Sequence, residues 1–487
     1  MSIPDARALP AEVEVAIVGS GFSGLGMAIL LQQAGITSYA VLEKADRIGG
    51  TWRENTYPGA ACDIPSHLYS FSFAPNPTWT RSFSQQAEIL AYLEHVADEH
   101  RLRPHLHFHA EVTAARWDGR AWTLTCKDGR TVRARSLVLG NGALHVPAYP
   151  DIAGLTDFQG PCFHSARWDH SVDLTDKRVA VIGTGASAIQ FVPQIAPKVR
   201  RLHLFQRTPA WVVPKPDHPI GRAARALYAR APGLQRLLRA GLYWQHELRF
   251  LAFNRPRLMA LAEPLARRHI ARNIKDPALR AALTPNYRMG CKRILPSNDF
   301  YPAVARANVE LVTDPIARIE PTGVRTSDGR LREVDVILLG TGFRISDYLS
   351  AIEVVGEHGR ELNAGWQHNP STYLGITVAG FPNLFLLMGP NTGLGHNSMI
   401  FMIEAQARYA LQGIQALRTR ETLAVRPDVQ RAFVQELERR YARTVWASGC
   451  RSWYQAPDGR NAALWPGFTV DYWLRTRTLD LDDYTPA

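Results

Sequence analysis

The sequence predicts an α/β protein that contains two Rossmann-like dinucleotide-binding domains and an inserted helical subdomain. Two glycine-rich turns of similar design, at Gly19 and Gly183, each follow a short apolar run that is typical of a buried strand. From about residue 216 to 284 the alternation of strands and helices stops, and Arg, Ala and Leu recur at helical spacing. A chain of 487 residues has room for about two to four domains.

The composition is that of an ordinary globular protein, with 46% hydrophobic and 21% charged residues. The net charge of +12 suits an enzyme that holds two pyrophosphates. No block of Lys and Arg and no RNA-binding motif accompanies it, so we expect no nucleic-acid partner. The five cysteines are scattered and never form a CxxC pair, so we expect neither a disulfide framework nor a metal site.

The hydropathy pattern predicts no integral membrane segment. No apolar run approaches the ~18 residues that a membrane-spanning helix needs. Residues 1–10 contain no apolar stretch of the kind found in signal peptides. We therefore expect a reducing, cytoplasmic location.

The first nucleotide-binding motif begins with residues 13–18, which we predict to be a buried strand that leads into a helix at 25–33. Three glycines lie between them at the spacing GxGxxG. Gly19 makes the tight turn, Gly21 lets a pyrophosphate approach the backbone, and Gly24 lets the helix and strand pack closely. The start of the helix supplies N–H groups for the phosphates.

A second predicted strand, 39–42, ends at Glu43, where a carboxylate can accept hydrogen bonds from ribose hydroxyls. Gly49, Gly50 and Trp52 follow directly, at the place where flavoproteins with two dinucleotides bring the chain along the flavin. The first site therefore fits FAD.

The second motif has a strand at 178–182, then Gly183, Gly185 and Ala188 at the spacing GxGxxA, and then a helix. The next strand, 202–205, ends in Gln206-Arg207-Thr208 rather than in an acid. A carboxylate there would repel a 2′-phosphate, whereas an arginine pairs with it. The second site therefore fits NADPH better than NADH.

Apolar runs after residue 285 predict further strands, so each nucleotide-binding domain is expected to be built from two separate parts of the chain. The FAD-binding domain is expected to comprise residues 1–147 and 376–487, and the NADPH-binding domain residues 148–215 and 285–375. The helical insert is expected at 216–284. We interpret it as a solvated basic face over a packed apolar face, with docking to a membrane surface or a partner as the alternative.

The stretch between the two turns, residues 158–169, reads FQGPCFHSARWD. It resembles the FxGxxxH[T/S]xxW[P/D] fingerprint of the type I Baeyer–Villiger monooxygenases, a family of class B flavoprotein monooxygenases. The matching positions are Phe158, Gly160, His164, Ser165, Trp168 and Asp169. Gly50-x-Trp52, Tyr57-Pro58-Gly59 and Asp63 look like the second, longer signature of the family.

One position departs from the commoner pattern. Ser165 also occurs in the related flavin-containing monooxygenases, which oxidise nitrogen and sulfur. Those relatives usually continue with Tyr and a basic residue, whereas this chain has Trp168-Asp169. The match therefore favours the Baeyer–Villiger family.

The resemblance implies an FAD enzyme that uses NADPH and O₂ to convert a small ketone into an ester or lactone through a C4a-peroxyflavin. An anionic peroxide needs a fixed positive charge and exclusion of bulk water. The active-site arginine of the family maps onto Arg293, and the carboxylate that orients it maps onto Asp63.

The resemblance assigns further roles. Lys292, Arg207 and Thr208 map onto contacts with the 2′-phosphate, and Trp453 maps onto a tryptophan of the cofactor and substrate pocket. We interpret His164 as a residue that couples the two cofactor domains rather than as a proton-transfer base.

Three other functions remain compatible with the sequence. Oxidation of sulfides or amines would use the same flavin peroxide without an arginine. A disulfide reductase would need a redox-active cysteine pair close to the flavin, and the sequence shows none. A regulatory protein could bind both nucleotides and dock a partner through the helical insert.

Overall fold

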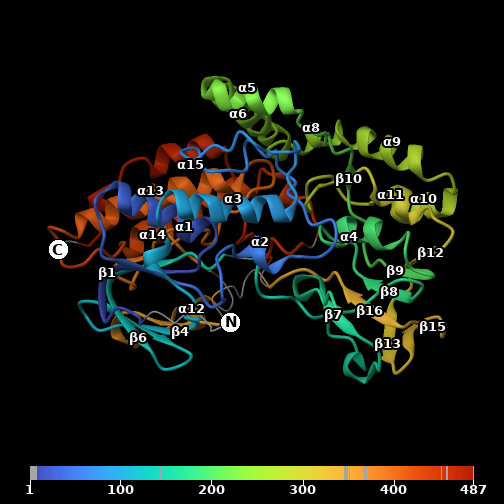
Figure 1. The fold of residues 1–487 in the computed structure, drawn as a ribbon, viewed down its shortest axis with the longest axis horizontal. Coiled ribbons are helices and arrows are strands. Elements are labelled where there is room, and N and C mark those ends of the chain that lie inside the picture. The colour runs from blue at the N-terminus through green and yellow to red at the C-terminus, as the bar shows by residue number, and fades with distance from the viewer. Residues whose placement is uncertain are drawn as a thin grey trace.

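Two mainly parallel sheets, each covered by helices, organise the chain (Figure 1). The computed structural model describes residues 8–142, 144–344, 349, 351–366, 370–450, 452–456 and 459–485. Within these residues no helix is both long and apolar enough to cross a bilayer. The predicted α/β class with two Rossmann-type sheets is confirmed.

The first sheet has eight strands in the order β17-β4-β5-β6-β1-β2-β3, with β18 beside β6. Strands β1, β2, β6 and β18 run parallel, so their carboxyl ends meet at one edge, where ligands bind in sheets of this kind. The bounds are β1 Glu12–Val18, β2 Tyr39–Leu42, β3 Leu106–His107, β4 Val112–Trp117, β5 Trp122–Cys126, β6 Thr131–Leu139, β17 Glu353–Val355 and β18 Leu384–Leu386.

Helices cover one face of this sheet (Figure 1). Helix α1 is buried from Phe22 to Leu31, because α13 lies across it on the side away from the strands. A helix that is apolar all round fits such a sandwiched position. The helices of this part are α1 Phe22–Gln33, α2 Thr51–Glu54, α3 Gln86–Glu99, α12 Leu362–Trp366, α13 Met399–Ala416, α14 Pro427–Tyr441 and α15 Thr469–Thr476.

The second sheet is fully parallel, with strand order β12-β9-β8-β16-β7. Helices α4 and α11 pack together on one face of it, and a small separate antiparallel sheet of β13, β14 and β15 packs against the other face. The bounds are β7 Cys162–His164, β8 Arg178–Ile182, α4 Ala188–Ile195, β9 Arg201–Phe205, α11 Phe300–Val304, β12 Val309–Val312, β13 Ile316–Glu320, β14 Gly323–Thr326, β15 Leu331–Glu333 and β16 Val336–Leu339.

The predicted helical insert is present and lies at the top of the view in Figure 1. Its elements are α5 Arg222–Arg230, α6 Pro232–Leu248, α7 Phe250–Phe253, α8 Pro256–Ala260, α9 Glu263–Asn273 and α10 Pro277–Leu283. Two short paired strands, β10 Val212–Val213 and β11 Leu295–Pro296, close it off. The expected packed apolar face is only partly present in α6, where Leu238 and Leu242 are partly buried but Leu234, Leu237 and Leu248 are exposed.

Strand β17 shows that the chain rejoins the first sheet earlier than residue 376. It pairs with β4 from Glu353 to Val355, so part of the segment 285–375 contributes to the first sheet. A strand of three residues carries too little periodicity to be recognised in a sequence. The division into five segments remains a proposal, with the return placed between β16 and β17.

Candidate active site

The first glycine turn is built around one fixed backbone conformation. Gly19 has φ +94°, a region that side chains rarely adopt, and a Cβ on Gly24 would lie 1.8 Å from the carbonyl oxygen of Gly19. A Cβ on Gly21 would stand no closer than 3.6 Å to its neighbour, the Cα of Gly50. The fold thus requires Gly19 and Gly24, whereas the glycine at 21 keeps open the approach of a ligand.

The same turn leaves an anion site at the start of α1. The helix begins after Gly21 without a hydrogen bond from any side-chain cap. Uncapped N–H groups and the positive end of the helix dipole suit a phosphate. The site therefore fits the pyrophosphate of a dinucleotide.

Glu43 follows β2 at the same edge, and it is buried within the turn. One carboxylate oxygen accepts hydrogen bonds from the Ser20 N–H at 3.0 Å and the Ser20 hydroxyl at 2.6 Å. The other accepts from the Ala45 N–H at 3.0 Å and pairs with Arg53 at 3.0 Å. A ribose hydroxyl would have to replace one of these donors, so the ribose contact of Glu43 stays a prediction.

Gly50 and Trp52 are fixed beside this turn. Gly50, at φ +52°, precedes α2, and a Cβ on it would lie 3.1 Å from the Cα of Gly21. The Trp52 ring donates to the Tyr69 hydroxyl at 3.2 Å, and its carbonyl accepts a bond from Gln86. These contacts hold both residues in place, and their position along the flavin stays a prediction.

The second turn repeats the arrangement on the other sheet. Gly183 has φ +106°, and a Cβ there would meet the Gly340 oxygen at 2.5 Å. A Cβ on Gly185 would lie 3.9 Å from that oxygen, so the fold leaves space at this glycine, as its predicted role beside a pyrophosphate requires. Helix α4 begins at Ala188, and the side chain of Ser187 before it makes no capping bond.

Two cations stand together beyond the second turn. Burial lowers the pKa of Lys292, and the positive charge of Arg207 lowers it further. The Lys292 ammonium lies 4.9 Å from the Tyr287 ring centre, and neither cation pairs with an acid in the described part of the chain. Thr208 lies next to Arg207 and is partly exposed. Like charges side by side fit a dianionic phosphate.

Arg293 and Asp63 form a salt bridge that joins segments 230 residues apart. The Nε of Arg293 donates to Oδ2 of Asp63 at 3.1 Å, and Nη2 donates to the same oxygen. Both side chains keep some exposure, 35% and 25%. No described residue accepts a bond from Nη1 of Arg293. The guanidinium is therefore held from one side and can donate from the other.

Electrostatics keep this pair charged. The negative charge of Asp63 raises the pKa of Arg293. Burial would raise the pKa of Asp63, but the charge and hydrogen bonds of Arg293, with a smaller effect from Lys215, lower it below its usual value. Because the folded pKa of Asp63 is depressed, its contribution to stability is present at neutral pH and is lost as the pH falls through that value.

Two neighbours of the pair were missed by the sequence analysis. The Lys215 ammonium donates to the Cys62 carbonyl at 3.1 Å, close enough to influence Asp63. Tyr454 is buried, which raises its pKa to about 12, and it interacts electrostatically with Arg293. Neither has a local sequence signal. Trp453 is 46% exposed against Tyr454, with ring centres 4.2 Å apart, and its role in the pocket stays a prediction.

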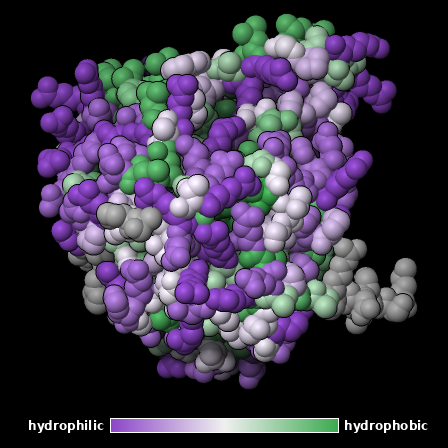
Figure 2. Space-filling model, turned by 90° about the vertical axis from the view of Figure 1, so that its left-hand side faces the viewer, coloured by the Kyte–Doolittle hydropathy of each residue, from purple (hydrophilic) through white to green (hydrophobic). Residues whose placement is uncertain are grey.

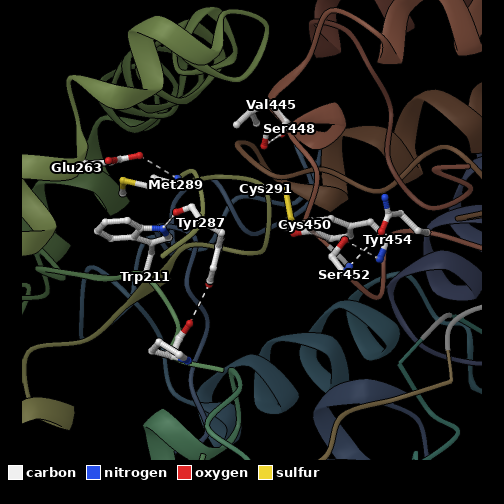
Figure 3. Close-up of a disulfide and its surroundings, with 12 residues drawn as sticks. Trp211, Glu263, Tyr287, Met289, Cys291, Val445, Ser448, Cys450, Ser452 and Tyr454 are labelled. Atoms are coloured by element: carbon white, nitrogen blue, oxygen red, sulfur yellow. Dashed lines mark hydrogen bonds between the residues drawn. A yellow bond between two sulfur atoms is a disulfide. The ribbon is translucent and has the colours of Figure 1, made fainter. Parts of the chain in front are cut away.

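A disulfide joins Cys291 to Cys450, with Cα atoms 6.2 Å apart (Figure 3). The sequence indicated no disulfide framework, and this single bond could not be foreseen, because a separation of 159 residues gives no spacing that a sequence pattern can recognise. Cys291 immediately precedes Lys292 and Arg293, and Cys450 lies four residues before Tyr454. The bond therefore ties the two cations to the tail segment beside them.

His164 lies at the carboxyl end of β7, in full burial. Its Nδ1 accepts a hydrogen bond from the Ala166 N–H at 3.1 Å, and burial lowers its pKa to about 4. The rings of Tyr149 and Phe343 lie 5.7 and 5.8 Å from it. Both belong to the segments that cross between the sheets, so His164 sits at the joint as a neutral imidazole.

Further contacts join the fingerprint and the residue just after it to segments that follow the first sheet's β2. Arg167 pairs with Glu54 at 2.8 Å, and His170 bonds to Thr56 at 2.9 Å. These contacts support the interpretation of residues 158–169 as a joint between the two cofactor domains.

Two glycine turns on separate sheets, each followed by a helix whose start has no side-chain cap, indicate an oxidoreductase that binds two dinucleotides. Residues 16–220 match the family model described as pyridine nucleotide-disulphide oxidoreductase. That match places the chain in the broad class that the geometry indicates.

Particular relatives narrow the class. The chain is 49% identical to a Baeyer-Villiger monooxygenase of Pseudomonas aeruginosa, over 99% of this chain and 93% of the relative. Its fold is similar to that of a steroid monooxygenase bound to NADP, with a TM-score of 0.86, 32% identity and coverage of 96% and 97%. It is also similar to OTEMO in complex with FAD and NADP, with a TM-score of 0.85, 27% identity and the same coverage. The chain belongs to the Baeyer–Villiger monooxygenase family.

We predict that Cys450→Ser and Cys291→Ser each lower the melting temperature, and that the double variant is no less stable than either. Closing a loop of this length restricts the unfolded chain by up to about 5 kcal/mol. Denatured protein should show three reactive thiols before reduction and five after it. Cys162→Ser, at an exposed unpaired thiol, is the control and should leave stability unchanged. Five thiols without reductant would refute the cross-link.

Proposed function

We propose that Arg293 is the catalytic cation of an FAD-containing, NADPH- and O₂-dependent monooxygenase that inserts one oxygen atom beside the carbonyl of a ketone. The product is an ester or a lactone. The observation behind this assignment is the salt bridge to Asp63, which holds the guanidinium and leaves Nη1 without a protein acceptor. Oxidation of sulfides or amines, the alternative, is not favoured, because the relatives are Baeyer–Villiger enzymes.

Bound FAD would carry electrons from NADPH to O₂ and activate the oxygen for insertion. The residues for holding it are the start of α1 with Gly21 for the pyrophosphate, and Gly50 with Trp52 along the ring system. NADPH would be held at the start of α4 with Gly185, and at its 2′-phosphate by Arg207 and Lys292.

Arg293 stabilises the negative charge that develops on oxygen during insertion. Guanidinium remains protonated at any working pH, and Asp63 strengthens that preference. A charge fixed in advance in a partly dry site stabilises a transition state without reorganising at the moment of reaction. Asp63 orients the guanidinium through two bonds to one oxygen, so it is a positioning residue.

The location in the cell is proposed to be the cytoplasm. Cys62, Cys126 and Cys162 are unpaired, as is usual in a reducing compartment. In that compartment a disulfide is usually transient or redox-responsive, which would make the Cys291–Cys450 bond sensitive to thiol reductants.

Arg293→Ala should impair the oxygen-insertion step while leaving the reduction of FAD by NADPH intact. We expect NADPH to reduce FAD at a near-normal rate, while ester formation falls by about a hundredfold or more, because the developing oxyanion loses its cation. Anaerobic stopped-flow absorbance measures the first, and chromatography of products across a ketone panel measures the second. Arg288→Ala is the control, since Arg288 pairs with Glu263 at 2.8 Å. Substantial ester from Arg293→Ala would remove the assignment.

Arg207→Ala and Lys292→Ala should each raise the KM for NADPH by about tenfold or more, the cost of one charge-assisted phosphate contact. The KM for NADH should stay as it is in the wild type. Steady-state kinetics with both cofactors decide this. Lys198→Ala, an exposed lysine before β9, is the control. Equal effects on the two cofactors would show that neither cation binds the 2′-phosphate.

His164→Ala should slow oxygenation while both cofactors still bind, because the joint that lets the NADPH domain change position loses its buried ring. Binding is measured by titration, and turnover by ester yield. His95→Ala, an exposed histidine of α3, should behave as the wild type. Normal turnover in His164→Ala would count against a coupling role.

A further inference from the structure

Three polar side chains of helix α6 face inward. Gln235, 3% exposed, donates to the Asn76 carbonyl at 2.6 Å. Arg239 donates to the carbonyls of His67 and Leu68 at 2.8 and 3.1 Å. Glu247, fully buried, accepts from the Thr469 hydroxyl at 2.7 Å. These bonds fix which side of the helix meets the protein.

The opposite side of α6 is apolar and exposed. Leu234, Leu237, Trp244 and Leu248 are 46%, 70%, 52% and 58% exposed. With Gly241 they recur at intervals of three and four residues, which places them in one row on one helix face. We call these five residues the α6 stripe. A contiguous apolar row turned to solvent and bordered by polar residues is typical of a surface that contacts a partner or a membrane.

The helices around α6 continue this pattern. Of fourteen large hydrophobic side chains that are exposed in the described chain, nine lie between residues 227 and 265. Outside the α6 stripe they are Leu227, Leu251, Leu258, Leu261 and Leu265. Figure 2 shows hydrophobic residues bordered by hydrophilic ones at the top edge of the molecule, where Figure 1 places α5 and α6.

The charge of the insert is strongly one-sided. Residues 222–275 hold twelve Arg and Lys against two acids, a net charge of +10 in a chain of net +12. One of the acids, Glu247, lies on the inward side of α6 and is fully buried. The exposed arginines include Arg222, Arg230, Arg236, Arg249, Arg255, Arg257, Arg267 and Arg268. The surface around the α6 stripe is therefore cationic.

We propose that the helical insert docks on the surface of an anionic phospholipid bilayer, with the α6 stripe inserted at the boundary between headgroups and acyl chains. Leucines and a tryptophan on one helix face, flanked by arginines, match the apolar and anionic layers of such a surface. The stripe projects from a helix at the edge of the molecule, and a planar bilayer can receive it. Two copies meeting through this face would bring two clusters of like charge together.

This inference does not rest on the proposed catalytic residues, none of which belongs to the α6 stripe. It concerns where in the cell the enzyme acts, in addition to which reaction it catalyses. The enzyme would lie on the membrane without crossing it, and the attraction would weaken as salt screens the arginines.

The test is co-sedimentation of the FAD-loaded enzyme with vesicles. One set is phosphatidylcholine, and the other is phosphatidylcholine and phosphatidylglycerol in equal parts. We expect binding to the anionic set, weakened by added NaCl. Leu237→Ser/Trp244→Ser should reduce that binding by about tenfold or more, because two inserted side chains are lost. Arg236→Glu/Arg257→Glu should also reduce it. Leu474→Ser/Leu481→Ser, which changes exposed leucines elsewhere, is the matched control.

FAD content, thermal unfolding and oligomeric state are measured on every variant, so that a folding defect is recognised. If Leu237→Ser/Trp244→Ser is misfolded, Arg236→Glu/Arg257→Glu, which alters only exposed charges, decides the question. Wild-type enzyme that ignores anionic vesicles would overturn the proposal. So would vesicle binding that survives both double variants. A wild-type dimer that Leu237→Ser/Trp244→Ser converts to a monomer, without vesicle binding, would show instead that the stripe joins two copies.

Discussion

The salt bridge between Arg293 and Asp63 is the interaction on which the proposed site depends. Each partner is partly withdrawn from water, and its charge is balanced by the charge of the other. The bridge also fixes geometry, since it joins a loop of the FAD side to the segment before β11. Lys215 and the disulfide at Cys291 support the same junction from two other directions. The same salt bridge thus orients the proposed catalytic cation and holds these two segments of the chain together.

The sequence predicted the parts of the fold that local pattern controls. Strands β1, β2, β8 and β9 lie where apolar runs indicated, and both glycine turns have the conformations that their spacing requires. The pairing of Arg293 with Asp63 came from a family resemblance, and the structure places the two side chains in contact. Features that depend on distant residues could not be read. The Cys291–Cys450 bond, Lys215 and Tyr454 meet the site only after folding, and β17 is too short to show a period.

Helix α6 explains why amphipathic spacing alone gave the wrong orientation. Periodicity says that one face is apolar, and burial of that face is the usual result. Here Gln235, Arg239 and Glu247 find hydrogen-bond partners inside the protein, so the side of the helix that carries them is covered, together with the partly buried Leu238 and Leu242. The apolar face is left for something outside the chain. The predicted cofactor sites at the sheet edges and the cationic surface around the α6 stripe are therefore formed by different residues.

A double-mutant cycle on Asp63 and Arg293 tests the central claim most directly. Ester formation and anaerobic FAD reduction are measured for Asp63→Ala, Arg293→Ala and the double variant. Residues that act as one unit give strongly non-additive losses. The account predicts that the double variant forms ester no more slowly than Arg293→Ala, with FAD reduction near normal in all three. Losses that simply add, or a parallel collapse of FAD reduction, would contradict it.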